Sequence, residues 1–433
     1  MTRMKESGID WIGQIPEEWE VIKVKFFTYM KGRIGWQGLK ADEFIDEGPY
    51  LVTGTDFKNG RVNWDTAYHI SQKRYEQAPE IQLKQGDLLV TKDGTVGKLA
   101  LIDELPDSAS LNSHLLVLRP LFNRYENHFL YYVLSSLEFK NYFQKVSIGS
   151  TMDSLSQEKM GEFIFALPNI NEQNSISRYL DKKTAQLDKV KSLLEEQIQK
   201  LKDYRSSLIY ETVTKGLDKT VPLKDSGIDW IGQVPEGWGV KRLKDYVDFQ
   251  TGTTPPQSIG VNQERKGVRW FKPGDFSDES VDLTSAENYI TSEIVKQQKL
   301  SVYPEKTILV VGIASIGKVG YSENFSYSNQ QITALKATGQ IFPKYLAYLM
   351  FSSGQYIRET ALYTIVPIIN NQYLSSLKIV LPNRVVQETI VEYLDKKIGQ
   401  INKMIVIKNE QIENINKQRQ TLIYDYVTGK RRV

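Results

Sequence analysis

The feature of this chain that most constrains its fold is a long helical pattern that occurs twice. In the first copy no Pro or Gly falls between 171 and 214, and five leucines recur every seven residues: Leu180, Leu187, Leu194, Leu201 and Leu208. This spacing is typical of helices that pair along an apolar seam. Pro168 precedes the pattern and Gly216 follows it, as expected at helix ends. With a rise of 1.5 Å per residue the seam is roughly 42 Å long, so something must cover it.

The second copy, at 387–429, supplies a partner for the first. Its seam positions are Leu394, Ile401, Lys408, Ile415 and Leu422. Lys408 replaces a leucine at the middle, but its aliphatic stem can lie along the seam while its ammonium stays in water. We therefore expect an antiparallel coiled coil in which each helix covers the other. The alternative is that each helix packs only on its own domain.

The duplication extends beyond the helices. The eight residues from Ser7 to Gln14 recur without change from Ser226 to Gln233, and the five from Tyr179 to Lys183 recur from Tyr393 to Lys397. Such matches in register indicate two copies of one unit. The segments between these blocks differ far more, so the repeated frame carries two divergent bodies.

Each body is predicted to be a mixed α/β domain. Residues 86–98 and 306–318 each predict a buried strand, a turn with glycine and a second strand, while 129–143 and 344–357 look helical. We expect two similar mixed α/β domains separated by two long helices, with internal pseudo-twofold symmetry. The expected boundaries are an N-terminal block at 1–19, a first domain at 20–168, a central helix at 169–216, a linker with the repeated block at 217–239, a second domain at 240–382 and a C-terminal helix at 383–433.

Composition limits the classes of protein and the cellular compartments that fit this chain. It has 433 residues, no cysteine and a formal net charge of +3. No apolar run approaches the roughly 20 residues that span a bilayer, and the first residues lack the apolar core of a signal peptide. We expect a cytoplasmic protein with no membrane partner. The mild positive charge permits DNA binding without indicating it.

The sequence contains only partial matches to known catalytic motifs. Residues 312–318 have the spacing of a phosphate-binding loop, but Val319 stands where a hydroxyl is needed, so we interpret them as a connection between strands. Asp107 and Glu138 only superficially resemble a metal-dependent nuclease site. The three histidines have neither metal-ligand spacing nor a cysteine partner. We expect no catalytic residue, no metal and no cofactor in this chain.

Polar turns at matching places in the two bodies are the best candidates for function. Lys and Arg neutralise phosphates, and Asn, Gln and Arg bond base edges in the major groove. The alternative for each is ordinary solvated surface. The candidates for nucleic-acid binding are Arg33, Trp36, Lys58, Arg61, Lys92, Thr95, Lys98, Asn112 and His114 in the first body, and Thr253, Gln257, Arg265, Lys266, Lys272, Ser315, Lys318, Asn329, Gln330 and Gln331 in the second.

These blocks resemble the specificity subunit of type I restriction-modification systems over essentially the whole chain. The Ser7 to Gln14 block followed by Pro16 and Trp19 is similar to the opening block of that family, and 86–98 to its recurrent strand and turn. Leu167-Pro168 with Glu172-Gln173 is similar to the start of its helical region. The second copy has Leu381-Pro382 but Gln387-Glu388, which we interpret as a reversed order of the last two residues.

The resemblance implies a non-catalytic DNA-specificity subunit of a host-defence restriction system. Each target-recognition domain would read one half of a bipartite site on double-stranded DNA, and the helices would set the gap and dock the other subunits. Its partners would be two methyltransferase subunits, which bind S-adenosylmethionine, and two restriction and translocase subunits, which use ATP and Mg²⁺. Two alternatives stay open: an architectural protein that bridges DNA without sequence preference, and an enzyme that cleaves DNA itself.

The internal repeat generates a first prediction. Residues 1–219 alone should form a symmetric dimer, because a second copy of the first helix can replace the missing one along the seam. Sedimentation at increasing concentration measures this. A fragment that stays monomeric at high concentration would contradict the proposed pairing.

Overall fold

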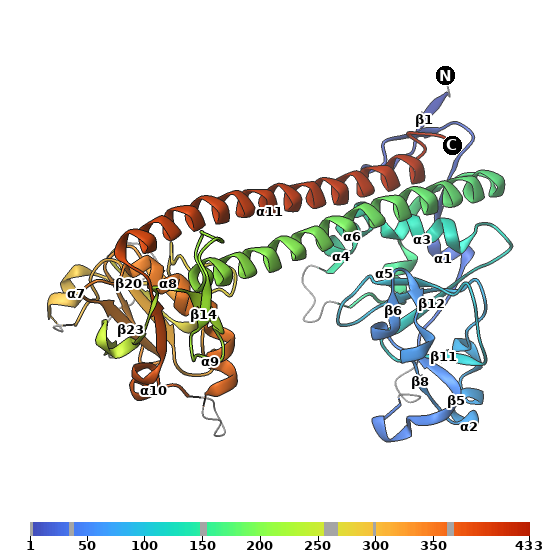
Figure 1. Ribbon diagram of the computed structural model, residues 1–433. Coiled ribbons are helices and arrows are strands. Elements are labelled where there is room, and N and C mark those ends of the chain that lie inside the picture. The colour runs from blue at the N-terminus through green and yellow to red at the C-terminus, as the bar shows by residue number, and fades with distance from the viewer. Residues whose placement is uncertain (1–2, 34–38, 148–153, 255–266, 298–299, 362–367) are drawn as a thin grey trace. The chain divides into compact units, whose positions relative to one another are not determined.

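The computed structural model describes residues 3–33, 39–147, 154–254, 267–297, 300–361 and 368–433. Contacts divide the chain into two compact units, Met1–Leu194 with Glu410–Val433 and Glu195–Asn409. The long helices are α6 (Ile170–Lys215) and α11 (Arg384–Val427) (Figure 1). Each unit therefore contains one half of each helix. The expected domain boundaries inside the units remain a prediction.

The first unit is built on two sheets. One has six strands in the order β4-β12-β9-β10-β7-β6 and the other has three in the order β11-β5-β8. Short pairs β1-β2 and β13-β3 complete it. Its elements before α6 are β1 (Met4–Glu6), β2 (Gln14–Pro16), β3 (Glu20–Lys23), α1 (Val24–Phe27), β4 (Thr28–Lys31), β5 (Ile45–Val52), β6 (Phe57–Lys58), β7 (Arg61–Val62), β8 (Tyr68–His69), α2 (Gln72–Glu76), β9 (Leu88–Thr91), β10 (Leu99–Leu101), β11 (Ala109–Leu111), β12 (Leu115–Pro120), α3 (Asn127–Ser135), α4 (Leu137–Ser147), α5 (Gln157–Gly161) and β13 (Ile164–Leu167).

The second unit repeats this plan, with four strands instead of six in its larger sheet. The orders are β17-β23-β20-β21, β19-β18-β22, β16-β24 and β14-β15, so every described sheet has a counterpart in the first unit. Its elements before α11 are β14 (Leu223–Asp225), β15 (Gln233–Pro235), β16 (Gly239–Arg242), β17 (Val247–Thr251), β18 (Val268–Phe271), β19 (Asn288–Ile290), α7 (Ser292–Gln297), β20 (Thr307–Val311), β21 (Val319–Ser322), β22 (Ser326–Ser328), β23 (Ile332–Ala337), α8 (Pro343–Ser352), α9 (Gly354–Thr360), α10 (Asn371–Ser376) and β24 (Lys378–Leu381).

Buried strands explain the layered cores. Side chains alternate between the two faces of a strand. Leu88 and Val90 of β9 therefore pack with helix α3 in one core, while Leu89 packs in another core on the opposite face. Strand β20 has the same alternation, since Ile308 packs with α8 in one core and Leu309 lies in another. Central strands buried on both faces read as continuous apolar runs in the sequence.

The predicted helix at 129–143 is two helices in the structure. α3 ends at Ser135, and Ser136 has the extended angles φ −70° and ψ 158°. The Ser136 hydroxyl donates to the Val133 carbonyl and accepts from the Phe139 amide, which joins the end of α3 to the start of α4. Ser353 separates α8 from α9 in the second unit. The apolar period alone did not reveal these serine breaks.

The long helices pair antiparallel within each unit. In the first unit Tyr179 lies against Tyr426 with ring centroids 4.6 Å apart, and Asp188 pairs with Arg419 at 3.6 Å. In the second unit Arg205 donates to Asn402 at 2.6 Å, and Lys408 donates to Gln197 at 2.5 Å. The partner's residue number falls as that of α6 rises, as in an antiparallel coiled coil.

The seam is most deeply buried where the helices join a body. Leu180 of α6 lies in the first unit's core beside Ile423 of α11, and Leu394 of α11 lies in the second unit's core beside Ile209 of α6. The seam residues Leu187, Leu194, Leu201 and Leu208 are only partly buried. Each helix thus packs both on a body and on the other helix, so the two arrangements that the sequence left open occur together.

A buried glutamine fixes the start of each long helix. Gln173 donates to the Pro168 carbonyl at 2.8 Å and accepts from the Glu126 amide at 2.9 Å. Gln387 makes the equivalent bonds to Pro382 and Phe342. The two glutamines therefore occupy the same structural position, and the reversed order inferred from the sequence is wrong. Both are fully buried.

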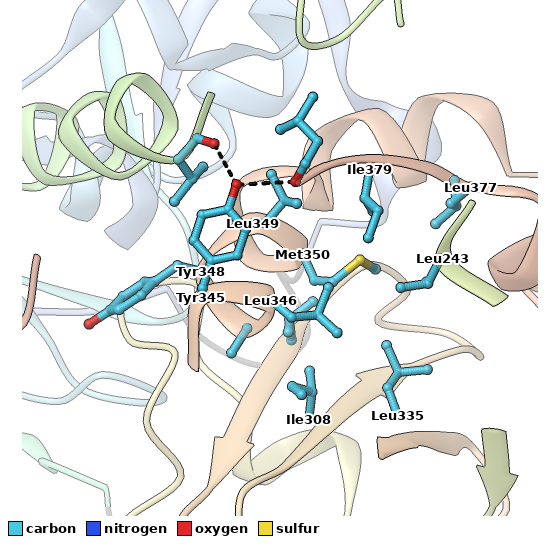
Figure 2. Packing of buried hydrophobic residues seen from close by; sticks show 14 of the residues in the cluster. Leu243, Ile308, Leu335, Tyr345, Leu346, Tyr348, Leu349, Met350, Leu377 and Ile379 are labelled. Atoms are coloured by element: carbon cyan, nitrogen blue, oxygen red, sulfur yellow. Dashed lines mark hydrogen bonds between the residues drawn. The ribbon is translucent and has the colours of Figure 1, made fainter. Parts of the chain in front are cut away.

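The repeated aspartates tie each helix to the helix that covers the sheet. Tyr132 donates to Asp181 at 2.6 Å, and Tyr348 donates to Asp395 at the same distance. Next to Tyr348, the Tyr345 hydroxyl lies 3.1 Å from the Val213 carbonyl and 3.2 Å from that of Val380 (Figure 2). The hydroxyl thus satisfies polar groups of α6 and β24 inside an apolar core.

The repeated Trp blocks pack on the far ends of the long helices. Gly216, at φ +68°, ends α6 against Trp238, and Gly429, at φ +73°, follows α11 against Pro16 and Trp19. Tyr210 donates to the Trp230 carbonyl, and Tyr424 donates to the Trp11 carbonyl. The two junctions are equivalent, although only the second block follows its helix directly in the chain.

Gly429→Ala should destabilise the protein by about 1–3 kcal/mol, because the residue has a left-handed backbone and an added Cβ would overlap Pro16. The matched control is Gly399→Ala, where a Cβ meets nothing within 4 Å inside α11. This change should stabilise the helix by about 0.5–1 kcal/mol. Thermal unfolding measures both. An unshifted transition for Gly429→Ala would contradict the described junction.

Candidate nucleic-acid interface

A polar corner forms in each unit where four chain segments meet. The first corner consists of residues 32–33, 92–94, 112–114 and 154–156. The second corner consists of residues 252–254, 312–314, 329–331 and 368–371. In the first corner, the Lys92 amide donates to the His114 carbonyl at 2.8 Å, and the Leu155 amide donates to the Lys92 carbonyl at 2.8 Å. The second corner has the same bonds between Gly312, Gln331 and Ile369. The shared backbone pattern defines which residues are equivalent.

The asparagines predicted from the sequence shape these corners. Asn112 accepts from the His114 amide at 3.0 Å, and Asn329 accepts from the Gln331 amide at 3.1 Å. Each side chain closes a tight turn before a buried strand. Asn112 and Asn329 therefore orient the two residues that follow them.

The second corner contains a groove of about 430 Å³. Its walls include Gln330, Gln331 and Asn371 with the isoleucines Ile313 and Ile368. Asn371 accepts from the Thr333 hydroxyl at 3.0 Å and donates to that of Thr251 at 3.3 Å. These bonds hold the segment 368–371 beside β17 and β23.

The first corner has a different chemical character at the equivalent positions. Lys92 stands in place of Gly312, and His114 in place of Gln331. The His114 ring lies 3.5 Å from the carboxylate of Asp93, and its side chain is 62% exposed. This corner is charged, whereas the second is rich in amides.

Arg33, expected at a DNA-facing turn, is only 4% exposed. Its guanidinium donates to the Leu111 carbonyl and to the Ser110 hydroxyl, both at 2.9 Å. Burial and the nearby charge of Arg74 lower the pKa of Arg33 to about 10, so it stays charged at neutral pH. Its bonds hold the corner together from inside.

The other predicted residues of the first unit lie at two places. Thr95 and Lys98 are exposed in the turn that follows the first corner. Lys58 and Arg61 lie on the hairpin of β6 and β7. This hairpin forms one edge of the six-stranded sheet, and β4 forms the other edge. Arg61 pairs with Asp103 and lies 5.9 Å from the Tyr131 ring of α3. The hairpin is therefore a separate surface from the corner.

In the second unit, Thr253 bonds the Tyr327 hydroxyl within the corner, and the ammonium of Lys272 lies 5.0 Å from the Trp270 ring. Residues 312–318 connect the antiparallel strands β20 and β21, which confirms the interpretation as a connection between strands. Ser315 is exposed in this turn, while Lys318 donates to the Phe276 carbonyl at 3.2 Å. Trp36, Gln257, Arg265 and Lys266 lie outside the described residues.

Sequence reasoning missed the fourth segment of each corner. Ile368 and Asn371 are far along the chain from Gly312, and they are brought there by tertiary contacts such as the 2.9 Å bond from the Ile369 amide to the Gly312 carbonyl. Asp93 was missed because a carboxylate is not expected beside phosphates. The run Asn370-Asn371-Gln372 between apolar residues was a signal that could have identified the segment.

The two carboxylates considered for a nuclease site belong to different layers. Asp107 is exposed and precedes β11, which packs in one core, whereas Glu138 is in α4, whose Phe139 packs in another. Burial raises the pKa of Glu138. Across the ranges that the structure describes, no three His, Cys, Asp or Glu residues are grouped to hold a metal ion. None of the described helices is long and apolar enough to cross a membrane.

Comparisons with known proteins agree with this architecture. The model of the type I restriction modification DNA specificity domain matches twice, at residues 16–202 and 235–414. The putative type I restriction enzyme MjaX specificity subunit of Methanocaldococcus jannaschii is 25% identical over 98% of this chain and 96% of its own. The EcoR124I/EcoR124II specificity subunit of Escherichia coli is 29% identical over 52% of this chain and 51% of its own.

Solved structures share the fold. A chain from a study of complex assembly and conformational transition in a type I R-M system has a TM-score of 0.75 at 17% identity, covering 96% of this chain and 99% of that chain. The HsdS subunit from Thermoanaerobacter tengcongensis has a TM-score of 0.52 at 17% identity, covering 96% and 98%. With the family domain matched in both repeats, the chain belongs to the type I restriction modification DNA specificity family.

Proposed function

We propose that this chain is the DNA sequence-specificity subunit of a type I restriction-modification complex, and that it has no catalytic site of its own. The observation that carries the proposal is the polar corner, formed by the same backbone bonds in both units of a duplicated family domain. Two similar recognition surfaces with different side chains suit a bipartite site whose halves differ in sequence.

Each half-site would be read in the major groove by one recognition domain, 20–168 or 240–382. Two readers that contact the same face of the duplex are spaced by about one helical turn, or roughly 34 Å. The paired helices would set this spacing, since each unit holds one half of both. Phosphate contacts would come from Lys58, Lys98 and Lys272 together with the partner subunits.

The partners are two methyltransferase subunits and two restriction and translocase subunits. S-adenosylmethionine, ATP and Mg²⁺ would bind to these subunits and not to this chain. We also propose a cytoplasmic location, because the DNA of prokaryotic cells such as those of the relatives lies there.

The outward faces of the long helices are the proposed docking surface for the methyltransferase subunits. Val406 and Ile407 of α11 are 56% and 53% exposed, which is unusual for two adjacent apolar residues of a surface helix. Val190 and Leu193 of α6 are each 47% exposed. Of the charged residues on these helices, Lys202 already donates to Glu279 at 2.5 Å and Glu196 pairs with Lys200 at 2.6 Å. Apolar burial is therefore the stronger source of affinity.

The decisive experiment is to coexpress the chain with a methyltransferase subunit encoded beside its gene and to map methylated adenines. The proposal expects one bipartite motif with a fixed gap. Methylation without a bipartite motif, or equal affinity for all duplexes at fixed salt, would favour an architectural protein instead. Metal-dependent cleavage by the isolated chain that Asp107→Ala and Glu138→Ala abolish would favour a nuclease.

Four residues inserted after Leu194 should change the gap that the complex accepts while both half-site sequences stay the same. The reason is that the insertion lengthens α6, which runs from one unit into the other. The control Ser192→Ala keeps the helix length and should keep the gap. A methylation assay on duplexes with gaps of increasing length measures the change, and an unaltered gap would argue against the helices as spacers.

The double change Val406→Ser and Ile407→Ser should weaken binding of the methyltransferase subunit at least about tenfold, since two apolar side chains no longer leave water. Lys403→Ser, an exposed change on the same helix, is the control. Titration calorimetry with the purified subunit compares them. Equal affinities would exclude this face of α11 from the interface.

A further inference from the structure

The groove of the second corner combines an exposed amide with apolar side chains. Gln330 is exposed, and its Oε1 accepts from the Thr254 hydroxyl. An amide oxygen has two lone pairs and the amide nitrogen has two hydrogens. The bond from Thr254 therefore orients the amide while it leaves one lone pair and the N–H groups available to a ligand.

Two isoleucines form the apolar part of the same groove. The backbones of Ile313 and Ile368 pair as an isolated antiparallel bridge, and the Ile368 side chain is 45% exposed. Asn371 is held on both sides of its amide, because its oxygen accepts from Thr333 and its nitrogen donates to Thr251. Its bonds hold the segment that carries Ile368 beside Gln330.

This pair of chemistries matches one base pair in the major groove. Adenine presents N7 as an acceptor and N6–H as a donor, which a glutamine amide bonds together, and thymine presents O4 and a C5-methyl group, which an apolar side chain contacts. Guanine would place O6 against the amide oxygen, and cytosine has no methyl group. An amide beside an exposed isoleucine thus selects A·T over G·C.

The first corner lacks this combination. The residues equivalent to Gly312, Ile313 and Gln331 are Lys92, Asp93 and His114, and Ser154 stands in place of Ile368. Lysine bonds guanine and aspartate accepts from cytosine N4. Equivalent positions of the two units therefore present side chains with different hydrogen-bonding groups.

We propose that the groove of the second corner reads an A·T pair, with the Gln330 amide on adenine N6 and N7 and Ile368 on the thymine methyl. The proposal rests on the proposed function, because it names the bases that one of the two recognition surfaces selects. It assigns Gln330 and Ile368 as specificity-determining residues.

The test uses the full chain with its methyltransferase subunit and duplexes that carry the mapped motif. At one A·T position of one half-site, 7-deazaadenine removes N7 and deoxyuridine removes the methyl group. The wild-type complex should lose methylation rate on the 7-deaza duplex by roughly tenfold or more, whereas Gln330→Ala should respond little to this change. Ile368→Ala should in the same way become insensitive to deoxyuridine.

A gain of specificity gives a second measurement. Gln330→Arg should shift the preference at that position from A·T toward G·C, since arginine bonds guanine O6 and N7. Gln340→Ala, an exposed amide outside the groove, is the matched control and should keep the wild-type preference. The other half-site should stay unchanged in every variant.

The outcomes separate this inference from the proposed function. If a bipartite motif is methylated but the wild type and Gln330→Ala lose the same rate on every 7-deaza duplex, the A·T assignment is wrong and the specificity function stands. If the wild-type complex methylates no bipartite motif, both fail.

Discussion

Burial of the two ends of each long helix in two separate cores is the interaction on which the structure depends. Leu180 and Ile423 share the first core, and Ile209 and Leu394 share the second. Neither core is closed by its own segment alone, because each needs the start of one helix and the end of the other. In each unit, the sheet that carries the polar corner packs against one of these cores. The middle of the seam, at Leu187, Leu194 and Leu201, is only partly buried.

Much of this architecture could be predicted from the sequence, because it depends on the spacing of apolar residues within short segments and on repeated blocks of residues. The heptad spacing around Leu194 predicted the helices, and the matching blocks predicted the duplication. The serine breaks at Ser136 and Ser353 were missed because a single hydrogen-bonded serine hardly changes an apolar period. The position shared by Gln173 and Gln387 was misjudged because adjacent glutamates drew attention, whereas the buried bonds belong to the glutamines.

The candidate site was less predictable, because four segments distant in the sequence form each corner. Selection of polar residues in predicted turns identified Lys92, His114 and Gln330, which do lie in the corners. It also selected Arg33, whose guanidinium N–H groups point inward and bond the Leu111 carbonyl. Charge alone does not tell whether an arginine contacts a ligand or ties a loop from within. Ile368 carried no polar signal at all, and its place beside Gln330 depends on a backbone bond between chain positions more than fifty residues apart.

The two equivalent Trp junctions carry a consequence for topology. In the second unit the backbone continues from Gly216 into the block that contains Trp230, whereas in the first unit the block that contains Trp11 meets α11 only through contacts such as the bond from Tyr424. The contacts are the same with and without the covalent link. Each block is thus held to its helix by noncovalent contacts, and the covalent link after Gly216 is not what positions the block of the second unit.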